Sequence, residues 1–488
     1  AEEEEPQAQA LFVAREDELA QLRSCLETVL TGRGRVQFVT GEAGAGKTTL
    51  ASAFIRQAQR DYANLLLGFG NCNALTGAGD PYLPFRDLLR SFTGDVEDLW
   101  LANTLSRAEA HRQWHALPEA ARTLVEYGPD LIGSFLPARQ LLALAMAAVP
   151  EGAEWLPELQ YLVNRDGAGR WDVEQGQFFE QYGRFLQALA ARRPLLIILD
   201  DLQWVDRASA NLLFHLGKHL EGSRILILGL YRPDEIALGR ASRDGGPARP
   251  HPMQKILNEY KRQFGDIILN LDRANKAGGR KFLEDLLDSE PNRLGAGFRE
   301  RFFQRTRGQP LFSIEMLRAM QERGDLVQET EGSWMEGPAL DWEKLPARIE
   351  GVIEERIQRL ETELKETLTV ASVEGEDFTV QVVARVREVA ERELVRQLSR
   401  ELDKKHRLVG EQGVERLGRQ KVYHFRFRHS LFQQHLYNKL GEIEREVLHL
   451  QVGETLESLY GEQVEEIAPQ LALHFTEAGE TEKAVVYH

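Results

Sequence analysis

The sequence predicts an α/β domain built on a parallel sheet, followed by mostly helical segments. Three observations support this fold class. Short apolar runs alternate with helical patterns over the first half, a glycine-rich loop joins one such run to a helix, and strand patterns become scarce after about residue 275. Continuous apolar runs bounded by turns are typical of strands that helices cover on both faces. With 488 residues, 42% of them hydrophobic, the chain is long enough for several cores.

Charge and cysteine content narrow the class of protein. The chain has 76 acidic residues against 60 Lys and Arg, a net charge of −16, which does not favour general binding to nucleic acid. The two cysteines, Cys25 and Cys72, form no disulfide framework and fit a reducing compartment. No apolar run reaches about 18 residues, the length that predicts a membrane span. We therefore expect a cytoplasmic protein that does not enter a membrane.

Strand and helix patterns alternate over the first half of the chain. Residues 1–10 read as an acidic, solvated tail, and we expect the chain to be part of a longer protein, because it starts without Met and stops inside a helical pattern. Helical spacing over 17–30 precedes a buried strand over 36–39, the loop 41–46 and a helix over 47–59. Further strands are predicted over 65–69, 195–199, 225–230 and 267–271, with mostly helices over 85–191.

Helical patterns dominate the second half. Leu345-Pro346 opens a segment in which helices precede a predicted hairpin, 408–411 with 422–427, and helices that end in a short hairpin are typical of a winged helix. We therefore predict four parts after the tail. They are an α/β domain over 11–274, a helical part over 275–345, a winged helix over 346–445, and a helical region over 446–488.

The loop after the first strand matches the phosphate-binding pattern G-x-x-x-x-G-K-[ST] in full. Glycines let backbone N–H groups face the phosphates, and the following helix directs its positive N-terminus at the same anion. Lys47 is predicted to contact the β- and γ-phosphates, and the Thr48 hydroxyl to ligate Mg²⁺. The position between a strand and a helix argues against a chance match, so we predict that ATP or ADP binds here. The loop residues involved are Gly41, Gly44, Gly46, Lys47, Thr48 and Thr49.

Two acidic residues close a later strand pattern. Asp200 and Asp201 follow the apolar run 195–199, and the carboxyl ends of parallel strands face the ligand crevice. Asp200 is predicted to hold Mg²⁺ through water, and Asp201 to orient or deprotonate the attacking water, the alternative for Asp201 being a helix cap or a solvated carboxylate. Arg232 follows the next strand and is a candidate for sensing the γ-phosphate, the alternative being a surface arginine.

Four motifs occur here in an order known from one family. LFVAREDEL (residues 11–19) is similar to an entry segment before the phosphate loop, and LDDLQWVD (199–206) to an extended Walker B segment. GQPLF (308–312) is similar to a G-x-P lid motif, and FRHSL (427–431) to a winged-helix segment with a phosphate-sensing histidine. Together they resemble the signal-transduction ATPases with numerous domains (STAND). The tail over 471–487 resembles one tetratricopeptide unit, with an ordinary helical hairpin as the alternative.

The resemblance implies a use for each part. Pro310 would pack on the adenine beside Val13 and Arg15, and residues 275–345 would form a lid. His429 would reach the β-phosphate of ADP and lock a closed form, the alternative being a histidine of the wing core or the surface. More repeats would follow, since one unit cannot bury its own face. An inducer would act on those repeats. The ATP-bound form would then self-associate and activate an effector outside these residues, and slow hydrolysis would reset the switch.

Two other functions stay open. A DNA-handling ATPase that resembles replication initiators also joins a phosphate-loop domain, a lid and a winged helix. It needs a basic recognition helix, and the acidic balance of this chain argues against direct DNA binding. A metabolic ATPase or kinase with its own small substrate would turn over quickly without any partner.

Overall fold

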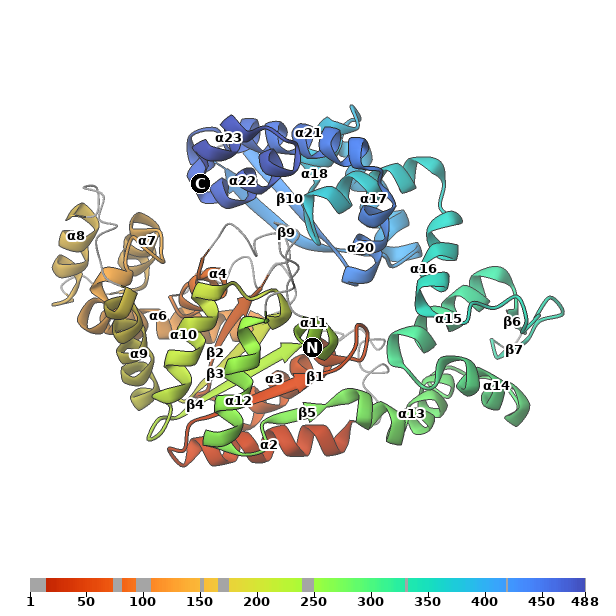
Figure 1. Ribbon diagram of the computed structural model, residues 1–488, viewed down its shortest axis with the longest axis horizontal. Helices are drawn as coiled ribbons and strands as arrows, with labels where there is room; N and C mark the ends of the chain where they lie inside the picture. Colours follow the sequence, from red (N-terminus) through yellow and green to blue (C-terminus); the bar gives the residue numbers. More distant parts are fainter. Residues whose placement is uncertain are drawn as a thin grey trace. The chain divides into compact units, whose positions relative to one another are not determined.

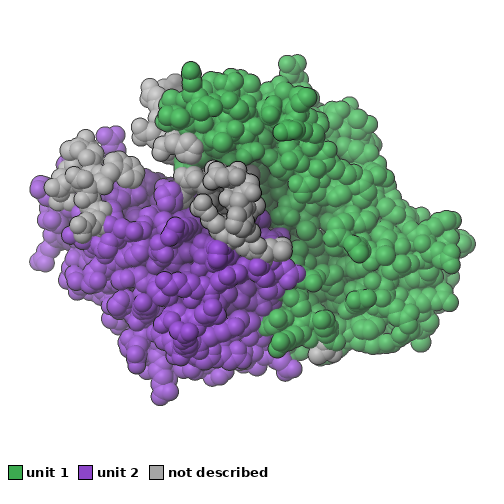
Figure 2. Space-filling view, viewed as in Figure 1, with its two compact units in different colours: residues 1–16, 41–50, 270–488 green, residues 17–40, 51–269 purple. Residues whose placement is uncertain are grey.

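The chain divides into two units, which Figure 2 shows in different colours. Unit 1 comprises residues 1–16, 41–50 and 270–488, and unit 2 comprises residues 17–40 and 51–269. The phosphate loop therefore belongs to the same unit as the C-terminal half of the chain. The computed structural model describes residues 15–72, 81–93, 107–149, 153–165, 175–238, 250–329, 332–417 and 420–487.

A five-stranded sheet forms the centre of unit 2, with the strand order β2-β3-β4-β1-β5 (Figure 1). The pairs β2–β3, β3–β4 and β4–β1 are parallel, which confirms the predicted fold class. β4 is buried along its full length, since a strand covered on both faces has no solvent-facing side. The strands are β1 (Arg35–Thr40), β2 (Leu66–Asn71), β3 (Leu195–Asp200), β4 (Ile225–Tyr231) and β5 (Ile268–Asn270).

The helices that lie between β2 and β5 in the sequence share one apolar core with the strands of this sheet. Helix α4 (Leu83–Phe92) approaches β2 closely because the strand contains glycine: a Cβ on Gly70 would lie 2.1 Å from the carbonyl oxygen of Pro84 in this helix. The helical insertion predicted between β2 and β3 is present. The helices are α2 (Glu16–Leu30), α3 (Lys47–Asp61), α4 (Leu83–Phe92), α6 (Arg107–Tyr127), η1 (Pro129–Leu131), α7 (Ala138–Ala148), α8 (Leu156–Arg165), α9 (Gln175–Arg192), η3 (Leu202–Trp204), α10 (Arg207–Lys218), α11 (Pro233–Leu238) and α12 (Pro252–Phe264).

The helical part predicted after the sheet contains helices and one short hairpin around a separate apolar core. Its first helix starts earlier than its sequence pattern indicates: the Asn270 side chain caps α13 by accepting a hydrogen bond from the Arg273 N–H at 3.0 Å. The hairpin is not predicted, because its strands have only three residues each. The elements are α13 (Leu271–Leu287), α14 (Ala296–Thr306), α15 (Pro310–Arg323), β6 (Leu326–Gln328) and β7 (Trp334–Glu336).

The next helix, α16 (Ile349–Gln358), belongs to two apolar cores. Val352 packs with residues of α13, α14 and α15. One residue further on, Ile353 packs with the segment that follows, as does Ile357. The two cores therefore meet on a single helix.

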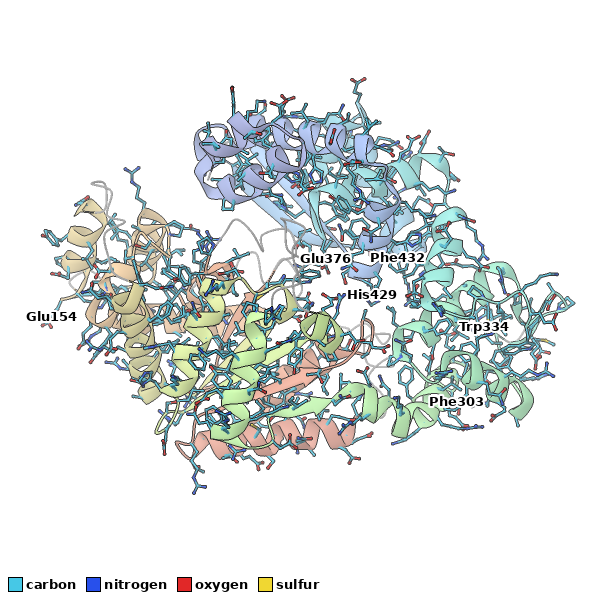
Figure 3. All side chains as sticks on the ribbon, in the orientation of Figure 1. Glu154, Phe303, Trp334, Glu376, His429 and Phe432 are labelled. Atoms are coloured by element: carbon cyan, nitrogen blue, oxygen red, sulfur yellow. The ribbon has the colours of Figure 1, made fainter. Side chains whose placement is uncertain are left out.

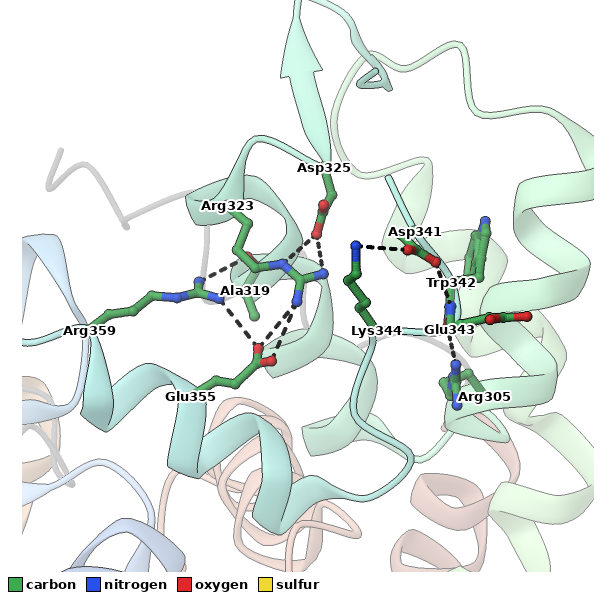
Figure 4. A network of polar contacts seen from close by, with 10 residues as sticks. All are labelled: Arg305, Ala319, Arg323, Asp325, Asp341, Trp342, Glu343, Lys344, Glu355 and Arg359. Atoms are coloured by element: carbon green, nitrogen blue, oxygen red, sulfur yellow. Dashed lines mark hydrogen bonds and ion pairs between the residues drawn. The ribbon is translucent and has the colours of Figure 1, made fainter. Parts of the chain in front are cut away.

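Polar contacts reinforce the join between α15 and α16, and Figure 4 shows part of them. Glu355 lies 3.4 Å from Arg323 at the end of α15 and accepts a hydrogen bond from Arg359 at 3.3 Å. A deeper ion pair joins Arg356 to Glu315 of α15, with both side chains almost fully buried. Arg356 also contacts Glu322 of α15, so its guanidinium joins α16 to α15 at two acidic side chains.

The predicted hairpin lies in a three-stranded antiparallel sheet with the order β8-β10-β9. Its long strands pair over more residues than the sequence pattern indicates. The order of elements is the one expected of a winged helix: helix, strand, helix, helix, strand, strand. The assignment of this part as a winged helix stays a prediction. The elements are α17 (Thr362–Glu374), β8 (Asp377–Thr379), α18 (Val380–Val386), α19 (Glu391–Arg396), the π-helical η4 (Gln397–Lys405), β9 (Val409–Leu417) and β10 (Gln420–Phe427).

The C-terminal region is helical, as predicted, and contains a buried histidine pair. His449 Nδ1 lies 2.9 Å from His474 Nδ1, and His449 Nε2 lies 3.0 Å from the Tyr437 hydroxyl. The assignment to tetratricopeptide repeats stays a prediction. Across the described residues, no helix has the length and apolar character that crossing a bilayer requires. The helices are α20 (Ser430–Lys439), α21 (Glu442–Tyr460), η5 (Gly461–Ile467), α22 (Ala468–Glu477) and α23 (Thr481–Val486).

Candidate functional site

The predicted phosphate loop follows β1 directly and leads into α3. Gly44 and Gly46 have φ values of 75° and 94°, a left-handed backbone that glycine adopts without strain. Among the described residues, a Cβ on Gly46 would meet only Arg15 Nη2 within 4 Å, at 3.9 Å. Open space with a cation beside it fits an anion held by backbone N–H groups at a helix N-terminus.

Lys47 is the first residue of α3 and is buried. Its ammonium donates hydrogen bonds to the carbonyl oxygens of Gly41 at 2.9 Å and Glu42 at 3.0 Å. Both acceptors belong to the loop, so the positive charge lies among the backbone groups that the pattern assigns to the phosphates. Thr48 and Thr49 follow in the first turn of the same helix.

The start of α15 packs on the phosphate loop. The Leu311 N–H donates to the Gly44 carbonyl oxygen at 3.2 Å, and a Cβ on Gly44 would lie 2.4 Å from Leu311 Cβ. At the start of α13, Asp272 Oδ1 accepts a hydrogen bond from the Glu42 N–H at 3.0 Å. The GQP motif, with Pro310 as the first residue of α15, therefore leads directly into a contact with the loop.

Arg15 approaches the loop from the other end of the sequence. Its Nη2 donates to the Ala45 carbonyl oxygen at 3.1 Å and also bonds to Asn275 Oδ1 on α13. These two acceptors restrain the guanidinium beside the loop. A contact between Arg15 and the adenine stays a prediction. Val13, predicted as its neighbour there, lies outside the described residues.

The two carboxylates at the end of β3 differ in conformation. Asp200 is the last residue of the strand, and its Oδ1 accepts a hydrogen bond from the Asp201 N–H at 2.8 Å. Asp201 has a left-handed backbone with φ 51° and makes no capping hydrogen bond to the following turn. The capping role belongs instead to Asp206, which accepts a hydrogen bond from the Ser209 N–H at 2.9 Å at the start of α10. The helix-cap interpretation of Asp201 therefore does not apply.

Arg232 follows β4, which lies between β3 and β1 in the sheet. Since these strands are parallel, their carboxyl ends share one edge, and Arg232 stands at the same edge as Asp200. Its side chain is only 11% exposed and pairs with Glu235 at 2.9 Å, which does not fit a surface arginine. Sensing of a γ-phosphate by Arg232 stays a prediction.

His429 immediately precedes α20 and is half-buried (Figure 3). Its ring centroid lies 6.5 Å from that of Phe432 in the same helix. Burial lowers the pKa of His429, Glu315 acts in the opposite direction, and Arg318 adds to the lowering. The imidazole is therefore biased towards its neutral form, which can both donate and accept a hydrogen bond. The predicted contact with a β-phosphate is not tested by these neighbours.

Sequence reasoning missed two residues that contact the candidate site. Gln203 lies inside the LDDLQWVD segment, and its side chain bonds to Asp201. Asp272 lies in the first turn of α13 and bonds to the phosphate loop. Gln203 could have been noticed as a polar residue within the recognised segment, whereas Asp272 carries no motif that distinguishes it from an ordinary carboxylate near a helix N-terminus.

Comparison with known proteins gives one match to a family model and a similar solved structure. Residues 11–228 match the sequence model of a family described as the AAA ATPase domain. No curated protein matches the chain. Among solved structures, the chain is similar to a STAND protein with a tetratricopeptide repeat sensor from Pyrococcus horikoshii, at 15% sequence identity and a TM-score of 0.39. The match covers 96% of this chain and 48% of the other, so this chain spans about half the length of that protein.

The phosphate loop, the parallel sheet and the match of residues 11–228 to the AAA ATPase domain model together support ATPase activity at this site. The sequence motifs resemble those of the STAND proteins.

Proposed function

We propose that the chain is a signalling switch controlled by ATP and ADP, with slow hydrolysis between its two states. The observation that carries the proposal is the contact between α15 and the phosphate loop, where Leu311 lies against Gly44. Because the helical part touches the loop itself, a change in the loop's occupant alters the surroundings of α15. A ligand can then shift the balance between two forms through its different affinity for each.

In this proposal the residues at the sheet edge carry out the hydrolysis. The loop glycines and Lys47 bind the phosphates, while Thr48 would ligate Mg²⁺ and Asp200 would hold it through water, and the ion would neutralise phosphate charge. Asp201 accepts a proton from the attacking water as the water oxygen bonds to the γ-phosphorus. The bond from that phosphorus to the bridging oxygen breaks, and ADP leaves with the electron pair. Arg232 senses whether the γ-phosphate is present.

The resting form in this proposal holds ADP, with Pro310 closing over the adenine and His429 reaching the β-phosphate. ADP must therefore make more contacts in the closed form than in the open one. An inducer acts on repeats beyond this chain, ADP is exchanged for ATP, and the opened units self-associate and activate an effector. The near-complete burial of the Arg356–Glu315 pair supports movement of α15 and α16 as one piece.

The DNA-handling alternative finds no support in the helix that would read DNA. The segment of α19 and η4 interleaves acidic with basic residues, and Arg396 pairs with Glu393 while Lys405 pairs with Glu401. Paired charges of this kind do not give the uniform positive face that phosphate contacts require.

Nucleotide binding is tested with Lys47→Ala. Lys344→Ala serves as the control because its ammonium is exposed and pairs with Asp341, three positions away in the chain. A charge-assisted hydrogen bond contributes about 1.5–3 kcal/mol, so Lys47→Ala should bind ADP and ATP roughly ten- to a hundredfold more weakly in titration calorimetry. The control should bind like the unaltered chain. Equal affinities for all three proteins would refute the proposal.

The switch itself is tested by nucleotide content and size. We expect ADP to copurify with the chain and light scattering to show larger assemblies only with a non-hydrolysable ATP analogue. His429→Ala should exchange bound ADP for ATP faster, because a contact specific to ADP is lost. Unchanged exchange would remove the role of His429, and an assembly state independent of the nucleotide would reduce the proposal to a plain ATPase.

A further inference from the structure

The Gln203 side chain connects the ends of β3 and β4. Its Nε2 donates a hydrogen bond to Asp201 Oδ1 at 2.6 Å, and its Oε1 accepts one from the Arg232 backbone N–H at 3.1 Å. Since a backbone N–H can only donate, the amide orientation is fixed, and Nε2 must be the group that faces Asp201. Gln203 is 3% exposed, so water does not compete freely for either contact.

His251 fixes the backbone of Gln203 from the start of α12. Its Nδ1 accepts a hydrogen bond from the Met253 N–H at 3.2 Å, and its Nε2 lies 2.9 Å from the Gln203 carbonyl oxygen. The first contact makes Nδ1 the acceptor, so Nε2 carries the proton and donates to Gln203. Gln203 is therefore held at its backbone by His251 and at its side chain by Arg232.

We propose that Gln203 is a positioning residue that orients the Asp201 carboxylate and couples it to the segment beginning at Arg232. This inference rests on the proposed function, in which Asp201 accepts the proton of the attacking water and Arg232 senses the γ-phosphate. One amide side chain links both residues, so a displacement of the Arg232 backbone moves the hydrogen-bond donor of Asp201. The presence of the γ-phosphate is thereby transmitted to the group that receives the proton.

Asp201 depends on such a donor because of its own conformation. A non-glycine residue at φ 51° is held there only when its surroundings determine the conformation. The Gln203 amide supplies a contact at the carboxylate, and the Trp204 N–H donates to the Asp201 carbonyl oxygen at 2.8 Å. Without the Gln203 amide, the Asp201 carboxylate would lose the hydrogen bond that sets its direction.

The discriminating variant is Gln203→Glu, which preserves size and still offers Arg232 an acceptor. It replaces the N–H donor with a carboxylate oxygen next to Asp201, and two carboxylates that share one site cannot both ionise easily. The acidic limb of the pH profile of kcat should therefore move to higher pH, with kcat at neutral pH at least tenfold lower. ATP affinity should stay within about threefold of that of the unaltered chain, because no predicted phosphate contact changes.

The same unit offers a matched control in Gln181. Its Nε2 donates to Asp130 Oδ2 at 2.7 Å and its Oε1 accepts from the Asp130 N–H at 3.0 Å, a similar pairing away from the predicted catalytic residues. Gln181→Glu creates the same clash of carboxylates and should leave the pH profile of kcat unchanged. Gln203→Met keeps length and adds no charge, but it removes the donor that favours the ionised Asp201 carboxylate. It should lower kcat and move the acidic limb to higher pH by less than Gln203→Glu does, and it provides a second test if Gln203→Glu folds poorly.

The outcomes separate this inference from the proposed function. If the unaltered chain binds ATP but releases no phosphate, the proposed hydrolysis fails, and the role of Gln203 fails with it. If the unaltered chain hydrolyses ATP and both Gln203 variants match its kcat and pH profile, only the role of Gln203 is refuted. A profile that moves equally in Gln181→Glu would show an effect of added charge alone, and would also refute it.

Discussion

Replacing Gly44 with alanine should break the contact between the phosphate loop and α15. Gly44 has φ 75°, where an L-residue costs about 1–2 kcal/mol. The new Cβ would lie 2.4 Å from Leu311 Cβ, and relieving such an overlap in packed surroundings costs about 1–3 kcal/mol. Together these effects should destabilise the contact by about 2–5 kcal/mol. Hydrogen exchange at the Leu311 amide, which donates to the Gly44 carbonyl oxygen, reports this contact directly.

Gly32→Ala separates the backbone strain from the overlap. Gly32 has φ 88°, and within the part of the chain that the structure describes nothing lies within 4 Å of a Cβ placed there. Gly32→Ala should therefore lower the free energy of unfolding by about 1–2 kcal/mol through backbone strain, without any change in hydrogen exchange at Leu311. Gly44→Ala should speed that exchange at least tenfold in the absence of nucleotide. Unchanged exchange at Leu311 in Gly44→Ala would refute the contact as described.

Three further predictions concern buried charges. Arg356→Ala removes one of the two arginines that contact the buried Glu315 and leaves Arg318 as its partner, so the free energy of unfolding should fall by about 1.5–3 kcal/mol in urea titrations, the value of one charge-assisted hydrogen bond; an unchanged free energy would contradict this. Burial raises the pKa of Glu374 from 4.5 to about 7, so the folded state binds its proton more tightly and stability falls as pH rises from 4.5 to 7. Glu374→Gln should therefore be more stable than the unaltered chain at pH 8 by about 3 kcal/mol in the same titrations. Equal stability at pH 8 would contradict this. Burial lowers the pKa of His449 to about 4 and of His474 to about 3. The unfolded state therefore binds more protons than the folded state, and stability falls as the pH drops below 6.5. The melting temperature of His474→Gln should fall less steeply between pH 6.5 and 4 than that of the unaltered chain.

Sequence patterns predicted those helices, strands and loops whose residues fit only one kind of local structure. The run ILILGLY of β4 has no polar period, and the loop before α3 carries every residue of its motif. The start of α13 could not be read in this way. Gly278 and Gly279 are poor helix formers inside its pattern, and its first turn is held by Asp272 bonding to Glu42, a contact between distant parts of the chain.

The residues of the candidate site also fall into two groups, those that a local pattern identifies and those that depend on distant partners. Lys47 and Asp200 are recognised because a motif or a strand end fixes their place in sequence. Gln203 and Leu311 act through partners on other segments, Arg232 and Gly44, so their contacts appear only when strand order and helix packing are known. A pattern of residue types does not encode which two segments meet.

The sharing of α16 between two cores has a practical consequence for dividing the chain into pieces. A fragment ending at residue 345 would lack Val352 and leave an uncovered apolar surface on α13 to α15, while a fragment starting at residue 346 would carry Val352 without its neighbours. Both pieces would tend to aggregate. Expression trials are therefore better served by keeping α13 to α16 on one piece together with the segment that packs on Ile353.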